Sequence, residues 1–145
     1  MLLVVAAAAV SLIGVLSSAS PAAAQGSRRP CGDPVMTSGH GSQGSPFTLK
    51  SMYDDNTAGQ VVVGEEFEIS NVPAGQVWTV VFTYDNTTVF FDGDSTATAA
   101  GIREVHMVLY QGGPSHLAAH AVSKVTGEVV HASVDLPVAP PRCGH

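Results

Sequence analysis

Apolar and polar residues alternate with a period of two in several short runs between residues 47 and 136. In one of these runs Phe67 and Ile69 share a face, while Glu66 and Glu68 share the opposite face. A period of two is typical of a β-strand with one buried face and one solvent-exposed face. We therefore predict no helix, and strands at residues 47–53, 65–70, 76–84, 87–91, 105–109, 117–122 and 130–136.

The run at residues 76–84 places Trp78 on the same face as Val80 and Phe82. This aromatic and aliphatic face is expected to turn inward, so Trp78 is predicted to lie in the core. In the run at 105–109, one face consists of Val105, Met107 and Leu109, and the other of His106 and Val108.

Turn-forming residues separate the predicted strands, at positions 54–56, 73–75, 92–94, 112–114 and 126–127. Gly supplies positive φ angles, while Asp and Asn side chains bond to their own backbone. About seven short strands at this spacing predict an all-β fold, an immunoglobulin-like antiparallel β-sandwich. Trp78 has no cysteine in the neighbouring predicted strands, so the inter-sheet disulfide of antibody domains is not expected.

The N-terminal segment, residues 1–24, has the pattern of a signal peptide. An apolar run from residue 2 to residue 16 leads to Ala22-Ala23-Ala24, and small residues of this kind precede signal-peptidase cleavage sites. The run is shorter than the roughly 20 residues that span a bilayer. We expect cleavage after Ala24 and a secreted or extracytoplasmic protein with no further membrane segment; an uncleaved anchor is the alternative.

Export determines how the two cysteines are interpreted. Residues 25–45 are rich in Gly, Ser and Pro and are expected to form an irregular N-terminal arm before the sandwich domain at residues 46–145. Cys31 and Cys143, the only cysteines, lie near the two ends of the mature chain. In an oxidising compartment an even count predicts an intramolecular disulfide, with two free thiols as the alternative.

Composition excludes several classes of protein. A chain of 145 residues accommodates one domain. Six basic residues against twelve acidic ones, a net charge of -6, argue against nucleic-acid binding, which needs a basic surface. A hydrophobic fraction of 45% is too high for a chain disordered throughout.

Catalytic patterns are absent from the sequence, and we predict that the protein is not an enzyme. There is no Gly-x-Ser-x-Gly turn, which positions the nucleophile of many serine hydrolases. A disulfide between the cysteines would leave no thiol nucleophile. Glu65 and Glu66 are adjacent and so point to opposite faces of a strand; we expect them to lie on a solvated strand.

Histidines are the remaining candidates for metal chemistry. His116 and His120 share a strand face but lie roughly 13 Å apart along it, too far to bind one ion. His106 and His131 belong to other predicted strands. Zinc needs three or four converging ligands. We therefore expect no cofactor and no metal site; a small metal-binding protein is the alternative, and it requires at least three of these histidines to converge.

Residues 61–78, Val-Val-Val-Gly-Glu-Glu-Phe-Glu-Ile-Ser-Asn-Val-Pro-Ala-Gly-Gln-Val-Trp, resemble the start of chagasin-type cysteine peptidase inhibitors. That family has a hydrophobic strand, a Gly, an acidic strand and an Asn-Pro-Thr-Thr-Gly-aromatic-x-Trp loop. Asn71, Gly75 and Trp78 fall in the same register. Residues 98–101 resemble the second, Gly-rich loop of the family and residues 111–115 the turn that follows. The overlap covers residues 60–138.

The resemblance implies an immunoglobulin-like fold and a protein partner, a papain-like cysteine peptidase, bound by three loops at one end of the sandwich. The sequence departs from the family where Val72–Ala74 replace Pro-Thr-Thr and where the third loop lacks Arg-Pro-Trp. The implied first loop is Asn71, Val72, Pro73, Ala74 and Gly75; the second is Thr98, Ala99, Ala100 and Gly101; the third is Lys124, Val125, Thr126 and Gly127.

Other bacterial immunoglobulin-like modules, including cohesin-like ones, also carry Gly-Glu-Phe before an alternating strand, as Gly64–Phe67 does here. The alternative function is therefore an adhesion or surface-interaction module without inhibitory activity. Such a module would bind through a sheet face or a strand edge, and would expose an apolar patch larger than a few hundred Å².

Overall fold

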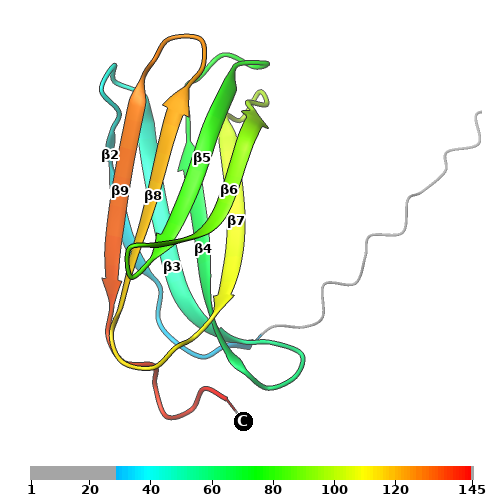
Figure 1. Cartoon of the computed structure of the whole chain (residues 1–145), viewed down its shortest axis with the longest axis vertical. Coiled ribbons are helices and arrows are strands. Elements are labelled where there is room, and N and C mark those ends of the chain that lie inside the picture. Colours follow the sequence, from blue (N-terminus) through cyan, green and yellow to red (C-terminus); the bar gives the residue numbers. More distant parts are fainter. Residues whose placement is uncertain (1–28, 145) are drawn as a thin grey trace, which may run out of the picture.

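The computed structural model describes residues 29–144, which form nine strands and no helix (Figure 1). The predicted signal peptide and residues 25–28 of the predicted arm lie outside the described residues. In the described part of the chain, no helix is long and apolar enough to cross a membrane. The strands are β1 (Arg29–Pro30), β2 (Val35–His40), β3 (Pro46–Asp55), β4 (Val61–Ile69), β5 (Val77–Tyr84), β6 (Thr87–Thr96), β7 (Ile102–Leu109), β8 (Ser115–Ser123) and β9 (Val129–Leu136).

Two antiparallel sheets pack face to face. The first sheet has the order β1-β3-β4-β7, with β2 also paired to β3, and the second has the order β6-β5-β8-β9. The chain forms β3 and β4 in the first sheet, crosses to β5 and β6, returns for β7 and finishes with β8 and β9. This is the immunoglobulin-like sandwich that the strand pattern predicted, and the prediction is confirmed.

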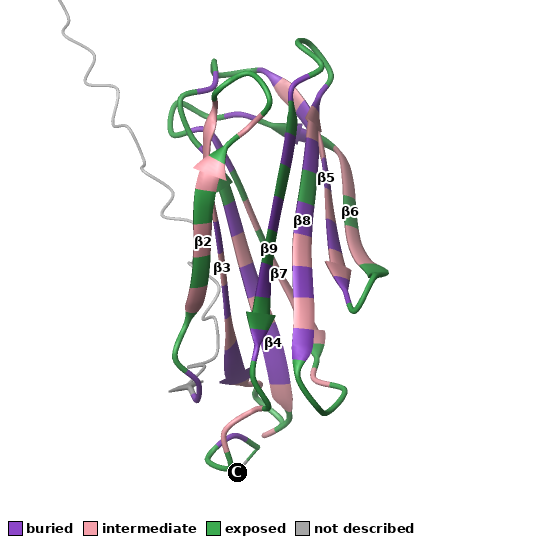
Figure 2. Ribbon diagram, turned by 90° about the vertical axis from the view of Figure 1, so that its left-hand side faces the viewer, coloured by how far each residue is buried: buried purple, intermediate pink, exposed green. Residues whose placement is uncertain are grey.

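The core lies between the sheets and is built from the inward faces of the alternating strands (Figure 2). Trp78, Phe82 and Phe67 are fully buried, and the Phe67 and Phe82 rings meet edge to face with centroids 6.3 Å apart. The prediction that Trp78 is a core residue is therefore confirmed. Along β9 the alternation is complete, with every second residue exposed.

The prediction of an irregular arm is wrong for part of its length. Val35–His40 forms β2, which pairs with β3 over six residues, so the sandwich begins before residue 46. The segment was missed because its side chains are small and polar and because Gly39 interrupts it. As an edge strand, β2 gains its stability from the ladder with β3, which the local sequence pattern does not reveal.

The predicted turn at residues 92–94 is also wrong, since these residues lie inside β6. The ladder between β5 and β6 shifts register here: Trp78 pairs with Ser95 and Val80 with Asp92. Gly93 and Asp94 therefore face a single residue, Thr79, and the strand is bulged. The Asp92 carboxylate accepts a hydrogen bond from the Asp94 backbone N–H at 2.8 Å. A turn-like motif thus bends a strand instead of ending it.

Strand β7 carries its more apolar face on the outside. Val105 and Leu109 are exposed by 47% and 51%, while Ile102 is buried and Glu104 and His106 are half-buried. Ile102 pairs directly with the inward-facing Ile69, and directly paired residues lie on the same side of a sheet. Ile102 therefore brings positions 104 and 106 inward with it.

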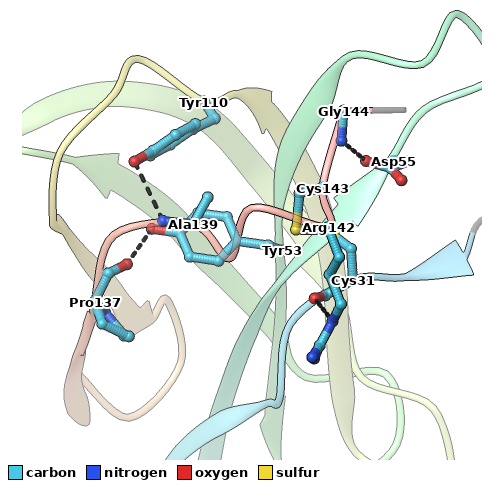
Figure 3. The surroundings of a disulfide bond; sticks show 9 residues. All are labelled: Cys31, Tyr53, Asp55, Tyr110, Pro137, Ala139, Arg142, Cys143 and Gly144. Carbon is cyan, nitrogen blue, oxygen red and sulfur yellow. Dashed lines mark hydrogen bonds between the residues drawn. A yellow bond between two sulfur atoms is a disulfide. The ribbon is translucent and has the colours of Figure 1, made fainter.

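The two ends of the described chain meet at one end of the sandwich, which we call the disulfide end (Figure 3). Cys31 and Cys143 form a disulfide with Cα atoms 5.2 Å apart, so this prediction is confirmed. The Arg142 guanidinium donates to the Cys31 carbonyl at 2.5 Å, and the Gly144 N–H donates to Asp55 at 2.6 Å. A disulfide of this kind is typical of an oxidising, extracytoplasmic compartment.

Candidate functional site

The three loops singled out by the sequence lie together at the end opposite the disulfide, which we call the loop end (Figure 1). The first loop joins β4 to β5, the second joins β6 to β7 and the third joins β8 to β9. Because β5 runs antiparallel to both β6 and β8, and β4 antiparallel to β7, all three connections fall at the same end.

The first loop, Asn71–Gly75, is anchored at one side chain and exposed at its tip. Val72 is 8% exposed and packs into the core, whereas Pro73 and Ala74 face solvent. Asn71 and Gly75 both have positive φ angles, 58° and 84°, and Gly is the residue that adopts this conformation at little cost. The conformation expected for Gly75 is therefore present.

A buried polar bridge connects the first loop to the third. The Trp78 indole N–H donates to the Gln76 side-chain carbonyl at 3.2 Å, and the Gln76 amide donates to the Ser123 hydroxyl at 3.1 Å. All three residues are buried. Buried polar groups of this kind are stable only when bonded, so the bridge holds the bases of the two loops at a defined separation.

The second loop, Thr98–Gly101, is a tight turn closed by reciprocal hydrogen bonds between the backbones of Thr98 and Gly101, at 2.9 and 3.0 Å. A Cβ atom at Gly101 would collide with the backbone carbonyl of Ile69 at the end of β4. Gly101 is thus required for close approach of this loop to the first sheet. The N–H of Gly75 donates to the Ala97 carbonyl at 2.8 Å, which joins the second loop to the first.

The third loop, Lys124–Gly127, is organised by the buried Ser123 hydroxyl, which accepts hydrogen bonds from the N–H groups of Val125 and Thr126 at 3.3 and 3.1 Å. Lys124 donates from its backbone to the Val77 carbonyl at 2.9 Å. At the tip, the Val125 side chain is 72% exposed, the most exposed large hydrophobic side chain among the described residues.

A fourth loop at this end, residues 41–45 between β2 and β3, was missed by the sequence analysis. The buried Glu128 carboxylate holds it by accepting from the Ser45 hydroxyl at 2.7 Å and from the N–H groups of Ser45 and Gln43 at 2.9 and 3.3 Å. Burial alone would raise the pKa of Glu128, but these three hydrogen bonds lower it below its usual value. The sequence signal that could have indicated this contact was Glu128, an acidic residue directly after the turn at residues 126–127.

The loop end presents small apolar side chains on a hydrogen-bonded base. The exposed apolar residues of these loops are Pro73, Ala74, Ala99, Ala100 and Val125, and the exposed polar ones are Asn71, Thr98, Lys124 and Thr126. The charged side chain of this cluster, Lys124, is paired with Asp94 at 2.7 Å. These side chains can make apolar contacts and hydrogen bonds with the surface of a partner.

Within residues 29–144, the histidines do not converge in threes. His106 lies inside, parallel to the Phe82 ring with centroids 6.3 Å apart, and burial lowers its pKa. His116 pairs with Asp135 at 2.7 Å, while His120 and His131 lie side by side on the outer face of the second sheet. Among the described residues, no group of three or more His, Cys, Asp or Glu residues could hold a metal ion.

The expectation that Glu65 lies on a solvated strand is wrong. Glu65 is 1% exposed and points into the core beside Phe67. Neither carboxyl oxygen has a hydrogen-bond partner among the described residues, and burial raises its pKa to about 8. The signal was present in the sequence, because residue 65 has the same parity as the inward-facing Phe67 and Ile69.

Comparisons with protein-family models, with curated proteins and with solved structures find no match for this chain.

Proposed function

We propose that this protein is an extracytoplasmic, non-catalytic binding protein whose loop end docks on another protein, and that the partner is a papain-like cysteine peptidase. The observation that carries the proposal is the arrangement of the first, second and third loops at one end, cross-connected by hydrogen bonds. The resemblance of residues 60–138 to chagasin-type inhibitors supports the choice of partner.

Pre-organisation favours an inhibitor over a flexible binding surface. Ordering loops on binding costs free energy, about 0.5–1.5 kcal/mol for each immobilised side chain with many rotamers. The exposed tips carry Pro and Ala, which have little side-chain entropy to lose, and their bases are already bonded through Gln76 and Ser123. Little additional ordering is therefore needed when the loop end meets a partner.

The shape of the first loop suits an open cleft that contains a thiolate nucleophile. A blocker of such a cleft must be narrow, and Pro73 and Ala74 are small and exposed. It must also keep its peptide bonds out of reach of attack, and the loop is held by Val72 in the core and by the bond from Gly75 to Ala97. The second and third loops then contact the walls of the cleft, as loops at one end of a sandwich do in antibodies.

We expect the inhibition to be weak. Aromatic and Arg anchors supply a large share of the binding energy in most interfaces. In this chain the third loop has no aromatic residue and no Arg, and Val125 is its exposed apolar side chain. We expect a dissociation constant in the micromolar range, which corresponds to a binding free energy of about -8 kcal/mol.

The test is a titration of papain with mature protein up to tens of micromolar, with a small fluorogenic substrate. Ala74→Arg should abolish inhibition, because it places a large charge at the tip of the first loop. Gln111→Arg is the matched control, since it adds the same side chain at an exposed position of the disulfide end. Unchanged papain activity with the wild-type protein would show that the peptidase is not the partner.

A second candidate function, the surface-interaction module, is favoured by the outer face of the first sheet. One row across this sheet runs Met36, Lys50, Glu66 and Val105; Met36 and Val105 are 60% and 47% exposed. In the next row Met52 and Met107 flank Gly64, above which the surface is hollowed.

If the protein does not bind papain, the outer face of the first sheet becomes the candidate binding surface. Val105→Glu should then reduce binding to the protein's own cell surface or matrix, while Ala74→Arg should leave it unchanged. The opposite pattern would favour the loop end.

A further inference from the structure

The outer face of the second sheet carries a pair of histidines that neither candidate function uses. His120 on β8 and His131 on β9 are directly opposite each other in the antiparallel ladder. Both are exposed, while their neighbours Ala121 and Val130 are buried, so both imidazoles stand on the solvent side. Their ring centroids are 6.4 Å apart, with the ring planes inclined at 59°.

This separation matches what one metal ion between two imidazoles requires. With a metal–nitrogen bond of about 2.0–2.1 Å and a ring radius of about 1.2 Å, the metal lies about 3.2 Å from each centroid. With this bond length, the two centroids are about 4.5 Å apart when the two metal–nitrogen bonds form a right angle. They are about 6.4 Å apart when the two nitrogens lie on opposite sides of the metal. The observed 6.4 Å is at the upper limit of this range, so binding a metal with ligands at a right angle would require the two exposed side chains to rotate toward each other.

The ring nitrogens of this pair are free to act as ligands. Among the described residues, neither the His120 nor the His131 imidazole makes a hydrogen bond or an ion pair; the two rings contact each other. His116, on the same face, differs because its Nδ1 already pairs with Asp135. The flanking positions on β8 are Ala118 and Val122, which offer no competing partner.

We propose that His120 and His131 form a two-histidine site for a divalent transition-metal ion, with water completing the coordination. Imidazole suits Cu²⁺, Ni²⁺ and Zn²⁺, and the affinity of nitrogen sites is highest for Cu²⁺ in this series. The site differs from the three-histidine arrangement considered from the sequence: the two ligands face each other across adjacent strands and are eleven residues apart in the chain.

The site exists only in the folded chain, which gives it a thermodynamic signature. The ladder between β8 and β9 holds the two rings together, whereas the unfolded chain must close a loop to do so. A metal that binds the folded state stabilises it by RT ln(1 + [M]/Kd). Metal ions should therefore raise the melting temperature of the wild-type protein.

The test is a titration of the folded mature protein with Cu²⁺ at pH 7.5, in competition with a weak chelator such as glycine. Electron paramagnetic resonance reports the coordinating nitrogens. We expect one site with two imidazole nitrogens. His120→Gln and His131→Gln should each weaken binding at least tenfold and remove the rise in melting temperature. His116→Gln is the matched control and should bind as the wild type does.

The double variant His120→Gln/His131→Gln measures background binding by the rest of the chain, including His145. Near-UV circular dichroism confirms that each variant is folded. The proposal is overturned if the wild type binds Cu²⁺ no more tightly than the double variant, or if His116→Gln removes the site as effectively as His131→Gln.

Discussion

The two ends of this sandwich are stabilised by different kinds of interaction. At the disulfide end, the Cys31–Cys143 bond, the contact of Tyr53 with Tyr110 and the bond from Arg142 to Cys31 hold the chain ends. At the loop end, no covalent cross-link is present among the described residues. Its loops depend on backbone hydrogen bonds and on three buried polar side chains, Gln76, Ser123 and Glu128.

The difference between the two ends assigns stability of the fold to the disulfide end and recognition to the loop end. A disulfide acts largely by restricting the unfolded chain, so it stabilises the whole domain wherever it is placed. Buried hydrogen bonds act locally and determine the positions of the groups they join. The disulfide end can therefore anchor the fold while the loop end holds apolar tips in place and leaves them exposed.

The largest expected effect comes from breaking the disulfide end. Cys143→Ser opens a loop of 112 residues, which the chain-entropy model values at about 4–5 kcal/mol. We expect this loss in the free energy of unfolding, measured by urea denaturation. The Cys143→Ser molecules that remain folded should inhibit papain through the loop end as the wild type does. Loss of papain inhibition in the folded variant would show that the two ends are coupled.

Trp78→Ala removes the buried ring that supports the loop end and should cost roughly 3–5 kcal/mol, as large core truncations do. Trp78→Phe is the matched control, because it keeps most of the ring but deletes the N–H bonded to Gln76. We expect the Phe variant to lose about 1–2 kcal/mol from the lost hydrogen bond and ring volume. Urea denaturation followed by far-UV circular dichroism measures both.

Glu65 lies between the two ends and should make stability fall as the pH rises from 4.5 to 8. Its folded pKa, about 8, exceeds its usual value of 4.5. The stabilising contribution is therefore complete below pH 4.5 and is lost as the pH rises through 8. His106 acts in the opposite direction, because its pKa is lowered by burial and it costs stability as the pH falls below its usual 6.5.

The effect of Glu65 is thus best isolated between pH 6.5 and 8, where it amounts to about 2 kcal/mol at about 1.4 kcal/mol per pH unit. Glu104 also faces into this part of the first sheet, and its carboxylate accepts a hydrogen bond from the Ser95 hydroxyl. Glu65→Gln should flatten this pH dependence. A slope that persists in the Gln variant would assign it to another group.

The smallest effect on stability, and the sharpest comparison of the ends, comes from two glycines. Gly75 in the first loop and Gly112 at the disulfide end have positive φ angles of 84° and 91°, and both have open space around them. Val at either position should cost about 1–2 kcal/mol of backbone strain. Thermal melts should thus agree, while papain inhibition should fall for Gly75→Val alone. Equal inhibition by the two variants would show that the first loop is not part of the interface with papain.

Parts of the fold follow directly from local pattern. The alternation of Trp78, Val80 and Phe82 predicts a strand and its inward face, and two cysteines in a chain that is predicted to be exported predict a disulfide. These inferences succeed because burial of one strand face and pairing of two thiols need no knowledge of neighbouring strands. The Asp92–Asp94 segment failed by the same local reasoning, because a Gly flanked by two Asp residues suits a bulge as well as a turn.

The candidate site was predicted less completely than the fold. The first, second and third loops were named from the sequence, and the structure brings them to one end. The fourth loop was missed because its anchor, Glu128, lies 83 residues from Ser45. Long-range hydrogen bonds of this kind leave no periodic signal in the chain.

The sequence by itself determined most of the strands, because a period of two is a local property of the chain, but β2 and the bulged part of β6 depend on pairing with β3 and β5. The tertiary structure alone decided that Val105 and Leu109 face outward and that His120 stands beside His131. Each of these depends on which strands pair and in what register, and a shift of one residue would reverse every face. Register is set by the packing of both sheets together, so it appears only when the whole core has formed.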